Sequence, residues 1–201
     1  PKSANELSIL LRAGALPAPL SIVEERTVGP GLGKDSIEAG KIATYVATIF
    51  VVCFMFVTYG LFGLFANIAL IVHVGMIFAL LSLLSATLTL PGIAGIVLTI
   101  GTAVDSNVLI YERMREEAKS GNSLVSTLEA GFNRAFATII DSNSTMAIAA
   151  LILLFLGSGP VRGFAVVFLL GILTTVVTAV TMTRMMIALW YRLSRPKTLP
   201  F

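Results

Sequence analysis

Hydrophobic residues fill most of this chain in long runs that are separated by short polar turns. An α-helix needs about 20 consecutive apolar residues to cross the hydrocarbon core of a bilayer. Runs of this length predict five membrane-spanning helices, near residues 42–62, 66–86, 92–112, 137–156 and 163–190. The last run is longer than one span requires. The pattern therefore predicts a membrane protein of the all-α class.

The N-terminal part of the chain follows a different pattern. Residues 4–13 have the apolar spacing of a short helix, and residues 20–28 alternate as a strand does. One helix and one strand cannot bury a core. We therefore expect residues 1–30 to be the end of an α/β domain whose remainder lies upstream, in a longer protein. Residues 31–41 are expected to form a polar hinge or an interfacial helix that leads into the membrane.

The segment 113–136 separates two of the predicted spans and is amphipathic. Ser123 is placed to cap a short helix, and apolar residues then recur every four positions: Leu124, Leu128, Phe132 and Phe136. We expect this helix to lie flat on the membrane surface.

Composition supports the membrane class. Hydrophobic residues make up 56% of the chain and charged residues 12%, and the mean hydropathy is +0.93. A soluble domain carries about twice this charged fraction. The formal net charge of +3 is too small to indicate a nucleic-acid partner. The chain has one cysteine, Cys53, so no disulfide can form within it.

The distribution of positive charge predicts the orientation. Lys and Arg residues concentrate in segment 113–136 and near the C-terminal tail, residues 193–201, whereas the turns on the opposite side hold only Arg162. Cytoplasmic segments are enriched in Lys and Arg. The tail and segment 113–136 are therefore expected to be cytoplasmic, and residues 1–30 to lie on the other side.

Three of the predicted spans contain polar side chains at a similar depth: Asp105, Asn107, Asp141, Asn143 and Arg184. Counting 1.5 Å per residue from the cytoplasmic ends places both carboxylates about 10 Å inside the membrane, and the guanidinium about 12 Å inside. A charge at the bilayer centre costs about 2.5–3.5 kcal/mol on insertion scales, and such residues mark ion pathways. We expect Arg184 to pair with one of the aspartates, with snorkelling to the surface as the alternative.

Asp105 is the leading functional candidate, because a buried carboxylate can load a proton from one side and release it on the other. Asp141 begins a span, where it also complements the helix dipole. The two asparagines are expected to join helices by hydrogen bonds. His73 is interpreted as a packed residue outside the site. These residues together indicate a proton-coupled membrane machine.

Three long stretches resemble one known family. LTLPGIAGIVLTIGTAVDSNVLIYERMREE (88–117), ANELSILLRAGALPAPLSIVEERTVGPGLG (4–33) and GSGPVRGFAVVFLLGIL (157–173) are similar to SecD-type members of the SecD/SecF protein-export family, in the RND superfamily. The resemblance implies a six-helix transmembrane bundle, five of whose spans lie in this chain. It also implies a location in the bacterial inner membrane, without enzymatic activity, metal or cofactor.

The resemblance further implies partners and residue roles. The partners are SecF, the SecYEG channel, YajC, membrane lipids and an unfolded preprotein, whose late export would be driven by protons, with sodium as the alternative ion. Asp105 occupies the proton-coupling position of the AVDxNVLI motif and Asn107 matches the same motif. Asp141 and Asn143 match the Asp-x-Asn of the next span. Three residues depart mildly from the family pattern: Ser106, Ser142 and His73.

Rival functions remain open. Another RND-type exporter would need the same relay, but with a large upstream substrate pocket. A structural assembly subunit would use Asp105 only for helix packing. An aspartyl intramembrane protease would pair Asp105 with Asp141, but the GTAVDSN stretch lacks the GxGD pattern of those enzymes.

Overall fold

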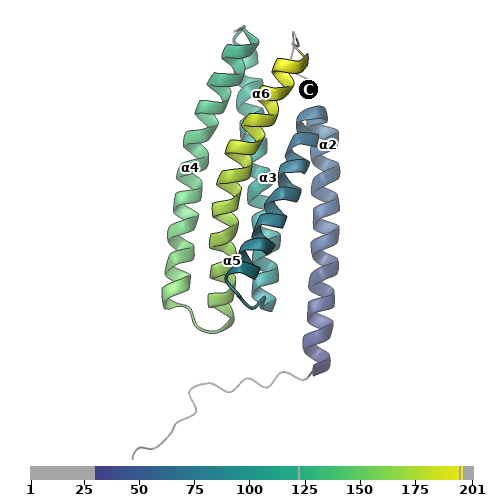
Figure 1. The fold of residues 1–201 in the computed structure, drawn as a ribbon, viewed down its shortest axis with the longest axis vertical. Helices are drawn as coiled ribbons and strands as arrows, with labels where there is room; N and C mark the ends of the chain where they lie inside the picture. Colours follow the sequence, from purple (N-terminus) through teal and green to yellow (C-terminus); the bar gives the residue numbers. More distant parts are fainter. Residues whose placement is uncertain (1–29, 122, 195, 197–201) are drawn as a thin grey trace, which may run out of the picture. The chain divides into compact units, whose positions relative to one another are not determined.

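The structure is a computed structural model that describes residues 30–121, 123–194 and 196. These residues form helices joined by short turns, with no strand among them (Figure 1). The elements are α2 (Pro30–Leu83), α3 (Leu90–Ala118), α4 (Leu124–Leu156), α5 (Pro160–Thr175), the π-helix η1 (Val176–Met182) and α6 (Thr183–Ser194). The predicted strand at 20–28 lies outside the described residues.

Helix α2 is two antiparallel limbs rather than one rod. Gly60 has φ 53° and ψ −120°, a conformation that glycine adopts easily because it has no Cβ. The chain reverses there, and the Asn67 side-chain amide donates a hydrogen bond to the Val52 carbonyl at 3.2 Å. The limbs therefore lie side by side (Figure 1). The predicted spans 42–62 and 66–86 lie mainly on these two limbs.

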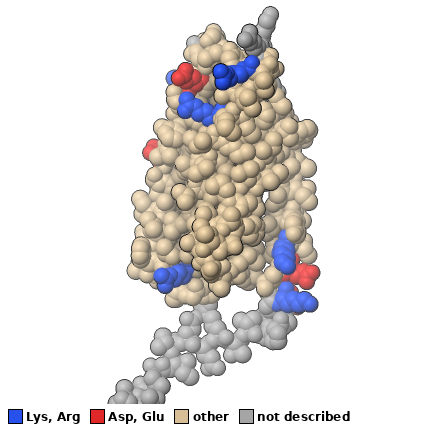
Figure 2. Space-filling model, in the orientation of Figure 1, with Lys and Arg blue, Asp and Glu red and all other residues tan. Residues whose placement is uncertain are grey.

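The prediction of an all-α membrane protein is confirmed. In the described part of the chain, four helices are long and apolar enough to cross a membrane: Lys34–Leu83, Leu90–Ala118, Leu124–Leu156 and Pro160–Ser194. The first of these contains the reversal at Gly60. Residues 31–41, for which a hinge or an interfacial helix was expected, are helical and belong to α2. Figure 2 shows, on one face of the molecule, charged side chains gathered mostly at the two ends.

Segment 113–136 differs from its prediction. Helix α3 continues to Ala118 and α4 begins at Leu124, so the segment is a hairpin of two long helices and not a separate surface helix. The Ser123 hydroxyl does cap α4, accepting a hydrogen bond from the Ser126 N–H at 3.4 Å. The hairpin is favoured because Gly131 brings α4 against α3. A Cβ at Gly131 would lie 2.7 Å from the Met114 Cα.

Helix α3 occupies the centre of the bundle and packs against α4 and α5. It begins at Leu90, after Thr89, whose hydroxyl accepts a hydrogen bond from the Gly92 N–H at 3.2 Å. Aromatic rings near its charged end join it to α2 and α6. The Phe62 ring lies 5.3 Å from that of Tyr111 and 5.2 Å from that of Trp190. These rings fix the end of the bundle where α2 reverses.

The closest approach of α3 and α5 is at Gly171. A Cβ added to Gly171 would overlap the side chain of Thr99. One helical turn away, Gly95 lies against Val167 in the same way, although with more room. Small residues at such positions let two helices approach closely and gain van der Waals contact, which is the main attraction between helices in lipid. We call the contact of Gly171 and Gly95 with the facing helix the glycine seam.

Replacing Gly171 by valine is expected to destabilise the bundle by about 1–3 kcal/mol, since the new side chain forces α5 away from α3. The measurement is the apparent melting temperature of the purified protein in detergent. Gly75→Val is the matched control, because a Cβ at Gly75 meets nothing within 4 Å. An unchanged melting temperature for Gly171→Val would contradict the close packing at the seam.

Candidate polar site of the helix bundle

The two candidate carboxylates lie at about the same level on neighbouring helices. Met114 and Gly131 mark the contact between α3 and α4. Nine residues from this contact toward the middle of each helix lie Asp105 on α3 and Ile140 on α4. Asp141 is the next residue, so the hairpin holds the two acids side by side in depth. At 1.5 Å per residue they lie about 14–15 Å from the Met114–Gly131 contact.

Both acids point away from the core of the bundle. Asp105 and Asp141 are exposed on its outer surface, and neither carboxylate has a hydrogen bond or ion pair among the described residues. Gly101, one turn from Asp105 on the same face of α3, is also exposed, and a Cβ there would meet nothing within 4 Å. The described helices therefore do not enclose either carboxylate. We call the α3 surface around Gly101 and Asp105 the acidic face.

The two asparagines point inward. Asn107 is 2% exposed and Asn143 is 4% exposed. The Asn107 Oδ1 accepts a hydrogen bond from the Thr183 hydroxyl at 2.8 Å, which joins α3 to the start of α6. The Asn143 amide donates to the Ile139 carbonyl at 2.7 Å, within α4. Asn107 therefore joins two helices, whereas the described contact of Asn143 is local.

Arg184 does not pair with either aspartate in the described part of the chain. Its guanidinium lies over the ring of Phe132, 4.9 Å from the ring centroid. Phe132 is next to Gly131, so this contact lies nearer the charged end of the hairpin than Asp141 does. The predicted ion pair is wrong, and the alternative, snorkelling, describes the geometry. The long side chain and its cation–π contact outweigh the tilt of the Cα–Cβ bond.

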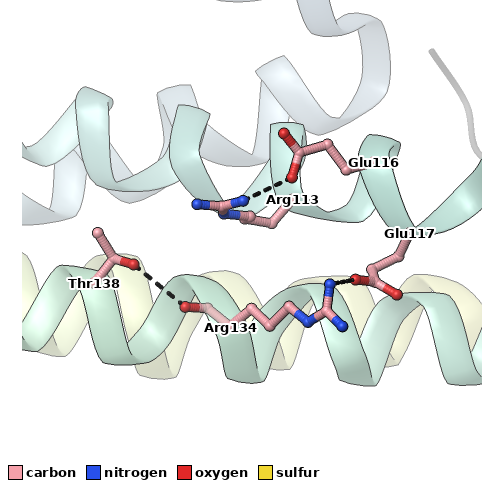
Figure 3. Close-up of polar contacts among 5 residues, drawn as sticks. All are labelled: Arg113, Glu116, Glu117, Arg134 and Thr138. Atoms are coloured by element: carbon pink, nitrogen blue, oxygen red, sulfur yellow. Dashed lines mark hydrogen bonds and ion pairs between the residues drawn. The ribbon is translucent and has the colours of Figure 1, made fainter.

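The end of the hairpin near Phe132 carries three ion pairs. Figure 3 shows two of them, Arg113 with Glu116 at 2.7 Å and Arg134 with Glu117. The third joins Arg115 to Glu112 at 2.8 Å. The pair of Arg134 and Glu117 connects α4 to α3. Glu117 is buried, so this pair is better protected from salt than the other two.

The structure adds a second set of polar residues, which the sequence interpretation left out of the site. His73, on the second limb of α2, is fully buried, and its Nδ1 lies 3.0 Å from the Thr174 hydroxyl on α5. Further along the same long helix, Thr178 and Thr183 are also buried. The available signal was the recurrence of threonine in an otherwise apolar span, at positions 174, 175, 178, 181 and 183.

This threonine-rich stretch coincides with the π-helix η1. π-helical turns are rare and occur frequently at functional sites. The Thr183 hydroxyl that reaches Asn107 directly follows η1 and also lies 3.3 Å from the Thr178 carbonyl. No group of three or more metal-ligating side chains occurs in the part of the chain that the structure describes.

Replacing Thr183 by valine is expected to destabilise the bundle by about 1–2 kcal/mol, because the buried Asn107 Oδ1 loses its donor. Thr181→Val is the matched control, since Thr181 is exposed on the same helix. The measurement is again thermal unfolding in detergent, extended to the Asn107→Leu single and double variants. Additive effects in this cycle would show that the two side chains do not interact.

Comparison with known proteins identifies relatives over nearly the whole chain. Residues 15–193 match the family described as protein export membrane protein SecD/SecF, C-terminal. The chain is 52% identical over 198 residues to protein translocase subunit SecD of Rhodobacter capsulatus, and 54% identical over 198 residues to that of Rickettsia prowazekii. Both alignments cover 98% of this chain.

A solved structure has the same fold. The crystal structure of SecDF from Thermus thermophilus, a translocon-associated membrane protein, matches 100% of this chain with a TM-score of 0.85 and 40% identity. The match covers 28% of that protein. The chain likewise spans 36% of the Rhodobacter relative and 38% of the Rickettsia relative.

Proposed function

This chain belongs to the SecD/SecF family of protein-export membrane proteins, and we propose that it is the membrane part of a proton-driven subunit of the bacterial Sec translocation machinery. In this role it assists late export of unfolded preproteins across the inner membrane. The proposal rests on the position of Asp105. Its carboxylate lies within a predicted membrane span, on an exposed face of α3, two residues before Asn107, which is hydrogen-bonded to Thr183 at the start of α6.

The acidic face supports a cycle of protonation. A carboxylate that faces hydrocarbon costs several kcal/mol when charged and much less when neutral. The described residues give the Asp105 carboxylate no partner. Its charged form therefore favours an arrangement in which water or a partner helix reaches the acidic face, and its neutral form favours a dry, closed one. Protonation thus has a different energy in the two arrangements, which is what couples a gradient to movement.

A helix that covers the acidic face supplies the natural partner. We place SecF there, because relatives from Brucella abortus and Thermus thermophilus are named SecDF. The open space above Gly101 allows a neighbouring helix to approach closely at the turn before Asp105. Association with the SecYEG channel is proposed by analogy with the relative that is called translocon-associated.

We also propose that the chain crosses the inner membrane five times. A straight helix of 54 residues would be about 80 Å long, far more than the hydrocarbon core of about 30 Å. The reversal at Gly60 divides α2 into two limbs, each long enough to span. Positive side chains lie near the C-terminal end of α3, in the N-terminal part of α4 and near the C-terminal end of α6. By the positive-inside rule these three ends are cytoplasmic. The tail is cytoplasmic and residues 1–30 are periplasmic.

The second candidate is a structural assembly subunit, in which Asp105 only fixes helix packing. Its exposed position argues against this role within the described bundle, where Asn107 and Thr183 perform it instead. A protease is disfavoured for a similar reason: neither Asp105 nor Asp141 lies in an enclosed pocket.

Replacing Asp105 by asparagine is expected to leave the complex assembled and to reduce gradient-dependent export at least about tenfold. The reason is that each charge moved through 100 mV provides about 2.3 kcal/mol, which the amide cannot exploit. The measurements are preprotein export by inverted membrane vesicles with and without a proton gradient, and copurification of the partner subunit.

Asp141→Asn is the matched control, because it makes the same change at the same level on α4. It is expected to reduce export less than Asp105→Asn. Full gradient-dependent export by the Asp105→Asn variant would support the structural subunit and refute the motor.

A further inference from the structure

His73 is the single histidine of the chain and lies in its most apolar part. Between Lys41 and Leu83 the sequence contains no charged residue. The imidazole is nevertheless 0% exposed, at the centre of the bundle between α2 and α5. An ionisable side chain inside a membrane protein is by default a functional candidate. Neither Asp105 nor the acidic face involves it directly.

The hydrogen bonds around His73 fix one side of its ring. The Thr174 hydroxyl lies 2.9 Å from the Leu170 carbonyl and 3.0 Å from the Gly171 carbonyl, and it has one proton to donate to them. Its oxygen is then available to accept from Nδ1–H of His73, at 3.0 Å. This assigns the neutral tautomer with Nε2 as an acceptor. Threonine therefore holds Nδ1 and leaves Nε2 for another partner.

No protein group among the described residues forms a hydrogen bond with the Nε2 of His73. A buried polar atom without a partner raises the free energy of the folded state. Buried sites of this kind in proteins take ordered water, provided that polar partners lie near enough. The Thr175 hydroxyl, on the residue after Thr174, is likewise buried and without a partner in the described chain. These are two of the five buried side-chain atoms that have no hydrogen-bond partner among the described residues.

Buried polar groups continue from His73 to Asn107, which points inward from α3. The Thr178 hydroxyl donates to the Thr174 carbonyl at 2.9 Å, and the Thr183 hydroxyl donates to Asn107 at 2.8 Å. Asn107 is two residues from Asp105 on α3. The nine residues from Thr174 to Thr183 span about 14 Å along the helix. His73 therefore lies deeper in the membrane than Asp105, at the far end of a row of buried polar side chains.

We propose that His73 is a second proton-binding station of the bundle, whose Nε2 binds a water molecule that the buried polar row supplies. Thr174 is the positioning residue that keeps Nε2 available. The inference deepens the proposed function and rests on it, because it assigns the group that relays protons between Asp105 and the extracytoplasmic side.

The proposed step adds one proton to Nε2 of His73 and later removes one proton from the same nitrogen. A hydronium ion at the site gives one proton to the Nε2 lone pair, which leaves water and an imidazolium whose Nδ1–H still donates to Thr174. The imidazolium then returns the Nε2 proton to a water on the other side and becomes neutral again. No other reactant is required.

Charges on the surrounding helices tune this step. Helix α2 contributes none near His73, and α5 carries only Arg162, in its first turn. The nearest acids by level are Asp105 on α3 and Asp141 on α4, both on outer faces. On α6, Arg184 lies at the charged end over Phe132. A charged Asp105 favours an imidazolium, so the two stations are expected to hold the proton in turn.

The first test is direct detection of water at His73. The complete complex is labelled with ¹⁵N-histidine in bilayers, and the His73 signals are isolated by subtracting the spectrum of a His73→Gln complex. Water-edited solid-state NMR is expected to show transfer from water to the His73 ring at the rate of an ordered internal water. Absence of transfer, while other labelled histidines give it, would overturn the proposal.

The second test separates this inference from the proposed function. Proton uptake driven by a gradient is measured in vesicles for His73→Gln, His73→Leu and Asp105→Asn, with copurification as the assembly control. Both His73 variants are expected to slow uptake at least about tenfold. Uptake at the wild-type rate in His73→Gln, with Asp105→Asn inactive, would overturn the second station alone. Wild-type uptake in Asp105→Asn would refute the proposed function instead.

Thr174→Val tests the positioning role and Thr181→Val is its matched control. Loss of the Thr174 hydroxyl is expected to shift the ¹⁵N resonance of Nδ1 and the pH profile of uptake, because the tautomer is no longer held. The control is expected to change neither. An unchanged Nδ1 resonance in Thr174→Val would show that the hydroxyl does not hold the ring.

Discussion

The need to give every polar group a partner in an apolar medium determines most of this structure. Water in a bilayer core is too scarce to hydrogen-bond a stray amide or hydroxyl, so the protein itself must do so. Asn107 is hydrogen-bonded to Thr183, His73 to Thr174, and the side-chain amide of Asn67 to the Val52 carbonyl. Each of these bonds joins two helices or two limbs. The polar residues therefore specify which helices are neighbours, while the apolar residues supply the area that holds them together.

The acidic residues are exceptions to this rule, and they are the residues to which function is assigned. Asp105 lies on an outer face, where no described residue forms a hydrogen bond or ion pair with its carboxylate. Arg184 meets the same need in another way, because its side chain is long enough to reach the charged end of the hairpin and the ring of Phe132. A short acid cannot do so. Its environment must come from a further protein chain or from water, which makes Asp105 sensitive to any change in what covers it.

Hydrophobic patterning predicted the helices well, because their apolar runs and caps are local properties. Thr89 and Ser123 begin their helices as such residues do elsewhere. The reversal in α2 came a few residues earlier than predicted, at Gly60, whose positive φ favours glycine. Side-chain direction was harder to predict. Whether Asp105 points in or out, and whether Arg184 meets an acid or a ring, depends on how helices rotate against each other. A single sequence does not contain that angle. The contact between His73 and Thr174 could not be predicted for the same reason, since the two residues lie 101 positions apart in the sequence.

The π-helix η1 has a mechanical consequence. Its seven residues lie between the glycine seam, where α5 packs closely against α3, and Thr183, whose hydroxyl donates a hydrogen bond to Asn107. A π-helical turn contains more residues than an α-helical turn. If η1 rewound as an ordinary α-helix, all residues C-terminal to it would rotate about the helix axis by a fraction of a turn. The glycine seam would hold α5 in place against α3, and α6 would turn relative to α5. A small local rewinding could thus be amplified into a displacement at the far tip of the protein.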